Sequence, residues 1–567
     1  MSAKAEGKGG VPVLSIRSRV RSLVSEAWAS ASDAGTLPEI EAAERPEIEI
    51  ERPANPDHGD LATNLGMKLA RPMRRSPLQI AEALAESMRS ASGGAMLSEI
   101  DVAPPGFINM RLATPWLEGV LDEAQAAGST FGRVRPEQRL NINVEFVSAN
   151  PTGPLTVGNA RGAFVGDLLC RVLEGAGHRV TREYYFNDSG RQVRILGASV
   201  VARRLGVELP EESYRGGYVD GLATEIPAAV WKDAEAAGDD RDAVIGDWAA
   251  ARIRDGIEAS LERLDVHFDV WKSEASLHDE GWVRRAVGKL RDGGHVFEEE
   301  GATWFRSTAF GDDKDRVIYR SNGAPTYFAS DIGYVSEKFD RDFDKLIYVW
   351  GADHHGTVAR VRNAAEAMGF DRDKVEMLMV AWVRFIRDGQ EISMSKRSGE
   401  FLTLDELLEE VGVDAARWSF ASRSASTPID VDIELARKQS AENPVYYVQY
   451  AHARICSILA KAAEAGLTRA PTFVGVLDGD EIASGLARDV LRLPEVVEDA
   501  AGSEETLGIT SYAMELATTF HGFYRDRRVI ELESPQTSAG RLALVDVTRL
   551  ALRNALALLG ISAPESM

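Results

Sequence analysis

Near the start of the chain, hydrophobic positions recur with a helical period. Apolar side chains return every three or four residues over 11–31 and again over 61–91, and a β-prone stretch, 48–51, lies between the two segments. Residues 107–112 then have the pattern of a strand. These segments predict a small α+β domain.

The period changes to two at residue 141. Apolar and polar residues alternate over 141–146, and a turn rich in Pro and Gly covers 150–154. Apolar positions over 160–173 return to the helical period after Asn159, which we expect to be the N-cap, and a second strand-like run covers 180–186. This order of elements is the βαβ unit of a doubly wound parallel sheet, which binds ligands at the carboxyl ends of its strands.

A second βα half follows an acidic interruption. Residues 208–242 are acidic and rich in Gly, Ala and Pro, which indicates a surface insertion. Residues 346–350 and 375–383 are apolar runs on either side of a helical pattern at 357–368. We therefore expect the sheet to continue through these runs.

The rest of the chain has the pattern of helices. Thr403 and Glu406 form a capping box that opens a helix over 404–411. Leu, Ala and Val then recur at helical spacing over most of 443–561, which predicts a C-terminal helix bundle.

The predicted fold class is thus α/β, with a doubly wound (Rossmann-like) parallel-sheet domain that contains an insertion and lies between an N-terminal α+β domain and a C-terminal all-α helix bundle. The expected divisions are a flexible tail at 1–10, an N-terminal domain at 11–133, a Rossmann-like domain at 134–385 with its insertion at about 205–300, a connecting helical region at 386–440, and an α-helical domain at 441–567.

Composition and charge narrow the classes of protein. The 567 residues are 44% hydrophobic and 27% charged, which excludes a disordered chain. Acids exceed bases by 23, which argues against a generally basic nucleic-acid binder but leaves room for a local basic groove. The two cysteines, Cys170 and Cys456, have no zinc-site spacing and fit a reducing cytoplasm. No apolar run approaches the ~20 residues of a membrane span.

The turn from Asn150 to Asn159 is the first candidate for chemistry. Gly158 lets a ligand approach the backbone, and the free N–H groups at the start of the helix favour anions such as phosphates. The turn has neither a GxGxxG nor a GxxxxGK motif, so dinucleotide and P-loop binding are not supported. The alternative is a helix that is merely capped by Asn159.

A polar loop flanked by glycines, 389–399, is the second candidate. Lys396 could neutralise charge on a leaving pyrophosphate, which is electrostatic rather than proton-transfer catalysis. The alternative is that Lys396 and Arg397 lie on an ordinary solvated loop.

The order of these two elements resembles that of the two signatures of class I aminoacyl-tRNA synthetases. A wider resemblance rests on the following stretches: Asn55-Pro-Asp-His-Gly-Asp, Pro105-Gly-Phe-Ile-Asn, Phe146-Val-Ser-Ala-Asn-Pro-Thr-Gly-Pro-Leu, Asn159-Ala-Arg-Gly-Ala, Tyr184-Tyr-Phe-Asn-Asp, Gly351-Ala-Asp-His-His-Gly, Met394-Ser-Lys-Arg-Ser-Gly and Asn443-Pro-Val-Tyr-Tyr-Val-Gln-Tyr-Ala-His-Ala-Arg. These stretches are similar to the bacterial type of arginyl-tRNA synthetase, and the resemblance covers nearly the whole chain.

The resemblance implies an arginine–tRNA ligase that forms arginyl-adenylate from ATP with Mg²⁺ and transfers arginine to the terminal ribose of tRNA(Arg), with activation dependent on bound tRNA. It also implies a cytoplasmic monomer with no membrane partner. It assigns the catalytic roles to Thr156, Asn159 and Lys396. The implied ATP contacts are Thr156, Gly158, Asn159, Gly351, Asp353, His354, Met394, Ser395 and Lys396.

Two departures from the family pattern stand in the signatures. Thr156 and Asn159 replace two histidines, and of these only Asn159 keeps a side-chain amide donor. Ser393 replaces the first lysine of the second signature, whereas the lysine that contacts phosphates in the family survives as Lys396. We therefore expect an active enzyme.

The resemblance places the arginine guanidinium against Glu145 and Asp331. Carboxylates around a planar guanidinium select arginine over lysine by geometry as well as charge. The alternatives are that Glu145 is the polar face of a strand and that Asp331 is an N-cap. The other implied arginine contacts are Ser148, Asn150, Asn159, Tyr327 and His354.

The adjacent His354 and His355 also suggest a metal site. Neighbouring residues rarely point at one ion and no third ligand recurs nearby, so we expect no protein-bound metal.

The resemblance places tRNA contacts in both terminal domains. Phe107 and Asn109 correspond to residues that stack on and read a D-loop base, and Tyr446, Tyr450 and Arg454 open the helical domain that faces the anticodon. The alternatives are a buried Phe107 with Asn109 in a turn, and an aromatic stripe that belongs to the core.

Two other functions remain open from the sequence. A nucleotidyltransferase of the same superfamily could ligate a small molecule, although the helical C-terminal domain would then have no use. A non-catalytic tRNA-binding paralogue would account for the missing histidines.

Overall fold

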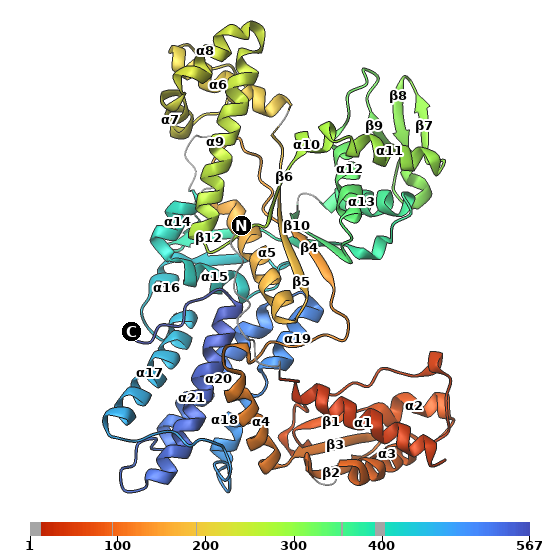
Figure 1. Ribbon diagram of the computed structural model, residues 1–567, viewed down its shortest axis with the longest axis vertical. Helices are drawn as coiled ribbons and strands as arrows, with labels where there is room; N and C mark the ends of the chain where they lie inside the picture. Colours follow the sequence, from red (N-terminus) through yellow and green to blue (C-terminus); the bar gives the residue numbers. More distant parts are fainter. Residues whose placement is uncertain (1–12, 93–94, 189, 353–354, 392–402) are drawn as a thin grey trace.

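The computed structural model describes residues 13–92, 95–188, 190–352, 355–391 and 403–567. Its centre is a five-stranded sheet in which every neighbouring pair is parallel, in the order β11-β10-β4-β5-β6 (Figure 1). The strands are β4 (Asn141–Glu145), β5 (Arg179–Phe186), β6 (Val270–Ser273), β10 (Lys345–Gly351) and β11 (Val375–Val380). The order reverses at β4, so the prediction of a doubly wound sheet is confirmed.

Helix α5 (Val157–Gly175) follows β4 and packs closely against it. A Cβ on Gly166 would lie 2.2 Å from the Phe146 ring, so only glycine allows this approach. Helix α12 (Tyr327–Asp340) precedes β10, and α13 (His355–Ala367) joins β10 to β11. The side chains of α12 and α13 belong to a core of their own, which includes Ile332, Val335 and Val361.

Two lobes interrupt the sheet. The first is helical and comprises α6 (Arg191–Leu205), α7 (Gly217–Glu225), α8 (Ala228–Ala236) and α9 (Arg241–Arg263), at the top of Figure 1. The second comprises α10 (Glu274–Asp279), α11 (Trp282–Asp292) and an antiparallel sheet of β7 (Val296–Glu299), β8 (Ala302–Phe305) and β9 (Arg316–Tyr319). Strand β6 lies between the lobes and pairs with β5, so the segment that we expected to be one insertion contains a strand of the central sheet.

The N-terminal region is an α+β fold. Its elements are α1 (Ile16–Asp33), β1 (Leu61–Thr63), α2 (Leu65–Met73), α3 (Pro77–Ser92), β2 (Leu97–Ala103), β3 (Phe107–Leu112) and α4 (Thr114–Ala127). The expectation of one helical segment over 61–91 is wrong. The segment starts with a strand, and the left-handed backbone of Arg74 ends α2 before Pro77 begins α3. Of the stretch 48–51, only Glu51 forms a bridge, to Ala62.

A small sheet connects the central sheet to the C-terminal helices. It contains β12 (Val383–Arg387), β13 (Gln390–Glu391) and β14 (Ile429–Asp432), with α14 (Leu404–Val411), α15 (Val413–Ala421) and α16 (Ile433–Arg437) beside it. The apolar run at 375–383 is therefore two strands in different sheets. The predicted capping box of Thr403 and Glu406 is confirmed.

The C-terminal region is the predicted helix bundle. It comprises α17 (Pro444–Glu464), α18 (Glu481–Val490), α19 (Leu493–Ser503), α20 (Leu507–Asp526) and α21 (Pro535–Leu558). Its helices α18 and α21 pack against α4, which ties the bundle to the N-terminal region (Figure 1). Within the described ranges, no helix has the length and apolar character that crossing a membrane requires.

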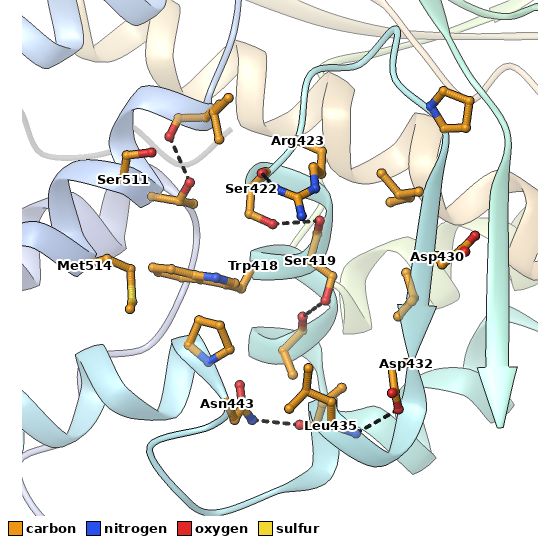
Figure 2. Close-up of a pocket in the computed structure, with 18 of the residues that line it drawn as sticks. Trp418, Ser419, Ser422, Arg423, Asp430, Asp432, Leu435, Asn443, Ser511 and Met514 are labelled. Atoms are coloured by element: carbon orange, nitrogen blue, oxygen red, sulfur yellow. Dashed lines mark hydrogen bonds between the residues drawn. The ribbon is translucent and has the colours of Figure 1, made fainter. Parts of the chain in front are cut away.

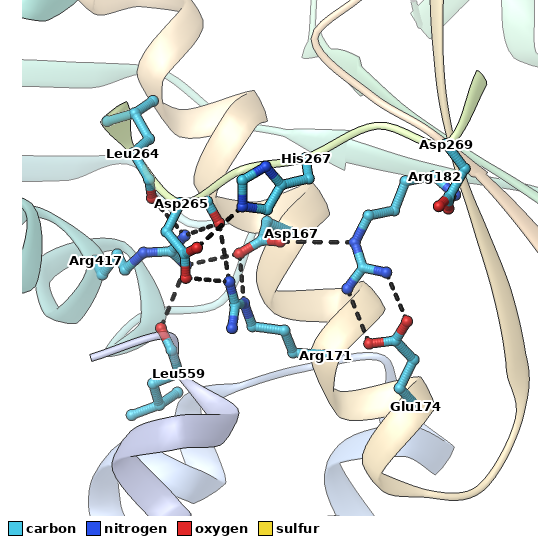
Figure 3. Close-up of polar contacts among 10 residues, drawn as sticks. All are labelled: Asp167, Arg171, Glu174, Arg182, Leu264, Asp265, His267, Asp269, Arg417 and Leu559. Carbon is cyan, nitrogen blue, oxygen red and sulfur yellow. Dashed lines mark hydrogen bonds and ion pairs between the residues drawn. The ribbon is translucent and has the colours of Figure 1, made fainter. Parts of the chain in front are cut away.

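A buried arginine, Arg417, forms hydrogen bonds with α5, with the end of the first lobe and with the end of the helix bundle (Figure 3). The Arg417 guanidinium on α15 donates to Asp167 Oδ2 on α5 at 2.7 Å, to the Leu264 and Asp265 carbonyls after α9 at 2.7 and 2.9 Å, and to the Leu559 carbonyl after α21 at 3.4 Å. The Arg417 side chain is completely buried. The next residue after Leu559, Gly560, has φ +63°, and a Cβ there would lie 2.6 Å from Arg417 Nη1.

We expect the substitution Arg417→Met to destabilise the fold strongly, because it leaves the Asp167 carboxylate buried beside one fewer cation. Loss of one partner from a buried ion pair costs about 3–5 kcal/mol. Scanning calorimetry of the purified chain measures the effect. Arg384→Met is the matched control, because Arg384 and Asp430 form an ion pair in which both side chains are about half exposed, and such pairs contribute at most about 1 kcal/mol. Equal thermal shifts in the two variants would contradict the structural role of Arg417.

Candidate active site

The carboxyl ends of all five parallel strands meet at one edge of the central sheet. Glu145 ends β4, Phe186 ends β5, Ser273 ends β6, Gly351 ends β10 and Val380 ends β11. From β4 the chain adds β5 and β6 on one side of the sheet and β10 and β11 on the other. A doubly wound sheet binds its ligands at the point where this direction changes. The candidate site is therefore at this edge, beside Glu145.

Helix α5 begins at this edge with a reciprocal cap. Thr156 is the N-cap, and the Asn159 Oδ1 atom accepts from the Thr156 N–H at 3.0 Å and from the Thr156 hydroxyl at 3.1 Å. The expectation that Asn159 is the N-cap is wrong, because Asn159 occupies the third helical position of a capping box. Gly158 is exposed, and a Cβ there would meet only the Thr156 hydroxyl, at 3.5 Å. The first helical turn is therefore open to an anion.

The chain that follows the second signature contacts the start of α5. Thr403 forms an antiparallel bridge with Thr156, and the Leu404 N–H donates to the Leu155 carbonyl at 3.1 Å. Met394, Ser395 and Lys396 lie outside the described residues. Thr403, the first described residue after them, lies directly against the N-cap of α5.

Arg161, a buried residue of α5, forms hydrogen bonds with the chain before the second signature and with the chain after α15. Its guanidinium donates to the carbonyls of Ala381 and Trp382 at 2.8 and 2.9 Å, and to those of Ser424 and Thr427 at 2.9 and 2.5 Å. Ala381 and Trp382 separate β11 from β12. Helix α5 thus holds the point at which the chain leaves the central sheet.

Gly351 ends β10 and is exposed at the same edge. Asp353 and His354 follow it and lie outside the described residues. In the described part of the chain, no group of three or more His, Cys, Asp or Glu side chains is arranged to hold a metal ion.

Two other carboxylates, those of Asp331 and Glu274, lie near Glu145. Asp331 lies on α12, and Glu274 is the first residue of α10 and accepts from the Ser330 hydroxyl at 3.0 Å. Burial raises the pKa of Asp331 to about 7, and the negative charges of Glu274 and Glu145 add to the rise, while Arg360 opposes it. Burial also raises the pKa of Glu274. Such a cluster favours a cationic ligand, since a cation would relieve the repulsion between the carboxylates.

The Glu145 carboxylate has a fixed orientation. It is buried, its Oε1 accepts from the Ser148 hydroxyl at 3.0 Å, and its Oε2 accepts from the Lys338 ammonium at 2.9 Å. Val147 and Ser148 have φ of +66° and +43°, and such left-handed backbone in residues other than glycine is a feature of functional sites. Glu145 is thus a buried, hydrogen-bonded carboxylate directly before a strained stretch of backbone.

Of the other predicted arginine contacts, His354 lies outside the described residues, while Tyr327 and Asn150 are described. Tyr327 is the first residue of α12 and its side chain is 63% exposed, so it is free to cover a ligand. The Asn150 amide donates to Gln192 Oε1 at 2.9 Å. Asp331 lies in the second turn of α12 while Thr326 is its N-cap, so the alternative that Asp331 caps the helix is wrong.

The sequence analysis missed Glu274, Tyr185 and Lys338. The carboxylate of Glu274 interacts with the Tyr185 hydroxyl, and burial together with this carboxylate raises the pKa of Tyr185. Lys338 shares one face of α12 with Tyr327, Asp331 and Tyr334, at helical spacing. That spacing was the signal available in the sequence, whereas nothing there placed Glu274 beside α12.

The predicted contacts in the N-terminal domain lie on strand β3. Phe107 is exposed and Asn109 is half-buried, and Asn109 pairs with Ala62 and Asp101 in the sheet. The alternative of a buried Phe107 with Asn109 in a turn is therefore wrong.

The predicted contacts in the C-terminal domain lie at four-residue spacing along the first half of α17. The rings of Tyr446 and Tyr450 are nearly parallel, with centroids 6.4 Å apart, and the Arg454 guanidinium lies 5.8 Å from the Tyr450 ring and 4.6 Å from the Tyr524 ring. A cavity of about 730 Å³ is lined by Tyr450, Arg454 and Tyr524 together with Arg525 and Arg528, which the sequence analysis missed. Stacked aromatics beside arginines suit unstacked nucleic-acid bases.

A cavity of about 860 Å³ lies elsewhere, between α15, β14 and α20 (Figure 2). The Trp418 indole lies opposite Met514 in it, and Asn443 and Ser511 belong to its polar lining (Figure 2). None of the predicted site residues lines this cavity, so it is a feature of the junction between the connecting region and the helix bundle.

Three family models match the chain. They are the arginyl tRNA synthetase N terminal domain over residues 18–112, the catalytic domain of tRNA synthetases class I (R) over 123–215 and 230–442, and the DALR anticodon binding domain over 448–567.

Individual relatives agree with these models. The chain is 43% identical to an arginine–tRNA ligase of Syntrophotalea carbinolica, over 97% of this chain and 100% of the relative, and 43% identical to that of Bacillus subtilis, over 93% and 96%. The fold is similar to that of arginyl-tRNA synthetase from Thermus thermophilus, with a TM-score of 0.76 and 24% identity over 97% of this chain and 100% of the other.

Proposed function

The chain belongs to the arginyl-tRNA synthetase family, and from that membership and the geometry above we propose how it charges tRNA with arginine. Its class of catalytic domain uses ATP, so the substrates are ATP, arginine and tRNA. The observation that carries the proposed site is the carboxylate cluster of Glu145, Glu274 and Asp331 beside the open N-terminus of α5.

Activation joins the arginine carboxylate to the ATP α-phosphorus and releases pyrophosphate. An arginine carboxylate oxygen attacks the α-phosphorus while the bond from that phosphorus to the bridging oxygen of the leaving pyrophosphate breaks. The open first turn of α5, with Thr156, Gly158 and Asn159, binds phosphate oxygens through backbone N–H groups, and Gly351, Asp353, His354, Met394 and Ser395 complete the ATP site. Lys396 neutralises the charge that develops on the leaving pyrophosphate.

The arginine site orients the substrate for this attack. Glu145 and Asp331 bind the guanidinium by its fork of N–H donors, and Glu274 adds negative charge beside them. Ser148, Asn150, Asn159, Tyr327 and His354 surround the rest of the amino acid. Because a lysine would leave these acids incompletely paired, the site rejects it without a separate editing step.

Transfer then moves the arginyl group to tRNA. The terminal ribose hydroxyl attacks the arginyl carbonyl carbon and AMP leaves, so the reaction needs positioning rather than a side-chain nucleophile. Phe107 and Asn109 contact the D-loop, while Tyr446, Tyr450 and Arg454 face the anticodon. The exposed Phe107 ring and the cavity beside Arg454 support these roles.

The proposal extends to the setting of the reaction. ATP brings Mg²⁺ as the counter-ion of its phosphates. The enzyme acts as a cytoplasmic monomer, which fits two unpaired cysteines, Cys170 and Cys456, and a single chain that carries all three regions.

The Asp331 carboxyl gives arginine binding a pH dependence. With a pKa of about 7 it is mostly protonated at pH 6 and mostly ionised at pH 8. Only the carboxylate attracts the guanidinium, so we expect the KM for arginine to fall roughly tenfold over this range. Among the described residues, the charges of Glu274, Glu145 and Arg360 act on Asp331, and the charge of Asp331 in turn contributes to the raised pKa values of Tyr185 and Tyr348. Asp331→Asn should raise the KM for arginine and flatten the profile. An unaltered KM in this variant would remove Asp331 from the site.

Lys396→Ala tests the role of the second signature. Loss of the ammonium leaves the pyrophosphate charge uncompensated, so we expect kcat for arginylation to fall by about 10²–10³-fold. Filter binding should show unchanged affinity for tRNA, because Lys396 lies in neither terminal domain. Wild-type kcat would exclude the charge-neutralising role.

Pyrophosphate exchange tests the order of the reaction. We expect radioactive pyrophosphate to enter ATP only when tRNA(Arg) is present, with tRNA of another specificity as the control. Equal exchange without tRNA would show that activation does not depend on tRNA, and would leave the proposed residues unaffected.

A further inference from the structure

Lys338 is a completely buried lysine beside the proposed arginine site. Its ammonium lies 2.9 Å from Glu145 Oε2 and 4.2 and 3.9 Å from the ring centroids of Tyr334 and Tyr348. A buried ammonium keeps its charge only when such partners replace its hydration. The environment of Lys338 is therefore built for a cation.

The neighbouring buried acids have other cations. Glu183 accepts from both Arg341 Nη atoms, at 2.7 and 2.9 Å, and Glu337 pairs with Lys272 at 3.2 Å and with Arg341 at 3.0 Å. The pKa of Glu183 is lowered: its burial would raise the pKa, and the charges of Lys338 and Arg341 outweigh that effect. Lys338 is in direct contact with Glu145, whereas it acts on Glu183 through its charge alone.

The remaining two acids of the cluster are different. In the described part of the chain, Glu274 and Asp331 have no lysine or arginine within ion-pair distance. Asp331 and Lys338 are seven residues apart on α12, which is two turns, so one helix face carries both an acid without such a partner and the lysine that pairs with Glu145.

We propose that Lys338 is a positioning residue for arginine, which acts through Glu145. This inference rests on the proposed function. The Lys338 ammonium and the Ser148 hydroxyl each take one lone-pair direction of the Glu145 carboxylate, and the other directions face the guanidinium. Lys338 also removes one negative charge from the cluster, so that Asp331 and Glu274 can ionise for the substrate.

The consequence of losing Lys338 follows from repulsion between carboxylates. Three uncompensated carboxyls in one site cannot all ionise, so one takes up a proton and becomes a poor guanidinium acceptor. The defect therefore appears in arginine binding, whereas ATP binds at the α5 N-terminus and is spared.

A double-mutant cycle with Lys338→Met and Glu145→Gln tests the proposal. We expect each single variant to raise the KM for arginine about tenfold or more, with the KM for ATP changed less than twofold. The double variant should have the same KM for arginine as Glu145→Gln alone, because the direct contact of Lys338 within the proposed arginine site is with Glu145. Additive effects, or parallel rises in both KM values, would overturn the proposal.

Folding is checked in the same variants. Removal of both partners of a buried ion pair is often tolerated even where removal of one is not, so thermal unfolding should rank the double variant above Lys338→Met. If Lys338→Met does not fold, the comparison of the double variant with Glu145→Gln still decides the question: equal KM values support the proposal and a higher value in the double variant refutes it.

Lys345→Met is the matched control. Lys345 pairs with Glu376 and Glu504 at the opposite edge of the same sheet, and its loss should leave the KM for arginine unchanged. The Asp331→Asn variant distinguishes an error about Lys338 from an error about the arginine site. If Asp331→Asn raises the KM and the cycle is additive, only the role of Lys338 is wrong, whereas an unchanged KM in Asp331→Asn removes the arginine site itself.

Discussion

The buried ion pair between Arg417 and Asp167 is the contact on which the relative positions of the parts depend. The Arg417 guanidinium donates at the same time to helix α5 beside the central sheet, to the end of the first lobe and to the end of the C-terminal bundle. Burial of a guanidinium is costly, and burial lowers the pKa of Arg417 despite the charge of Asp167. The cost is offset only when the carboxylate and the three carbonyls are all in place. The pair therefore favours one arrangement of three parts over any other.

Helix α5 connects this ion pair to the candidate active site. Asp167 holds its middle, Arg161 holds the carbonyls between β11 and β12, and Thr156 at its start bridges to Thr403. The segment that contains Lys396 lies between β13 and Thr403. Helix α5, whose N-terminus we propose as the phosphate site, therefore contacts the described chain both before and after that segment. The two signatures are far apart in sequence because two lobes intervene.

The hydrophobic period predicted most of the regular elements of this fold. It failed at boundaries that are set by individual hydrogen bonds. Strands β4, β5, β10 and β11, helices α5 and α14 and the helix bundle have clear apolar patterns or caps. The run at 375–383 gave no sign of a break, because the break is imposed by Arg161, more than two hundred residues earlier. Strand β6 was missed because its four half-buried residues carry no period. Asn159 and Thr156 are both good caps by residue type, and the reciprocal hydrogen bonds between them decide which one caps.

The site was predictable only where the family resemblance named residues. It gave Glu145 and Asp331 but not Glu274 or Lys338, since the partners of a buried charge lie on other elements and spacing along one element does not reveal them. The face of α12 is the exception, because Asp331 and Lys338 are separated by a helical repeat. A sequence pattern can show that two charges share a face, but not which third charge they meet.

The excess of acids along the chain has a local counterpart in this cluster. Most buried charges here are paired within the protein: Asp167 with Arg417, Glu183 with Arg341 and Glu145 with Lys338. Asp331 departs from this rule, and the rise of its pKa to about 7 is the physical consequence of leaving it beside other acids. In the proposed site the missing cation is the substrate guanidinium, so arginine binding releases a proton and completes the ion pairs. An ammonium at the end of a lysine substrate carries the same charge, but its three donors on one nitrogen lack the planar fork of a guanidinium and match a fixed pair of carboxylates less well. Selectivity for arginine then comes from an unfinished set of ion pairs whose geometry the fold has already fixed.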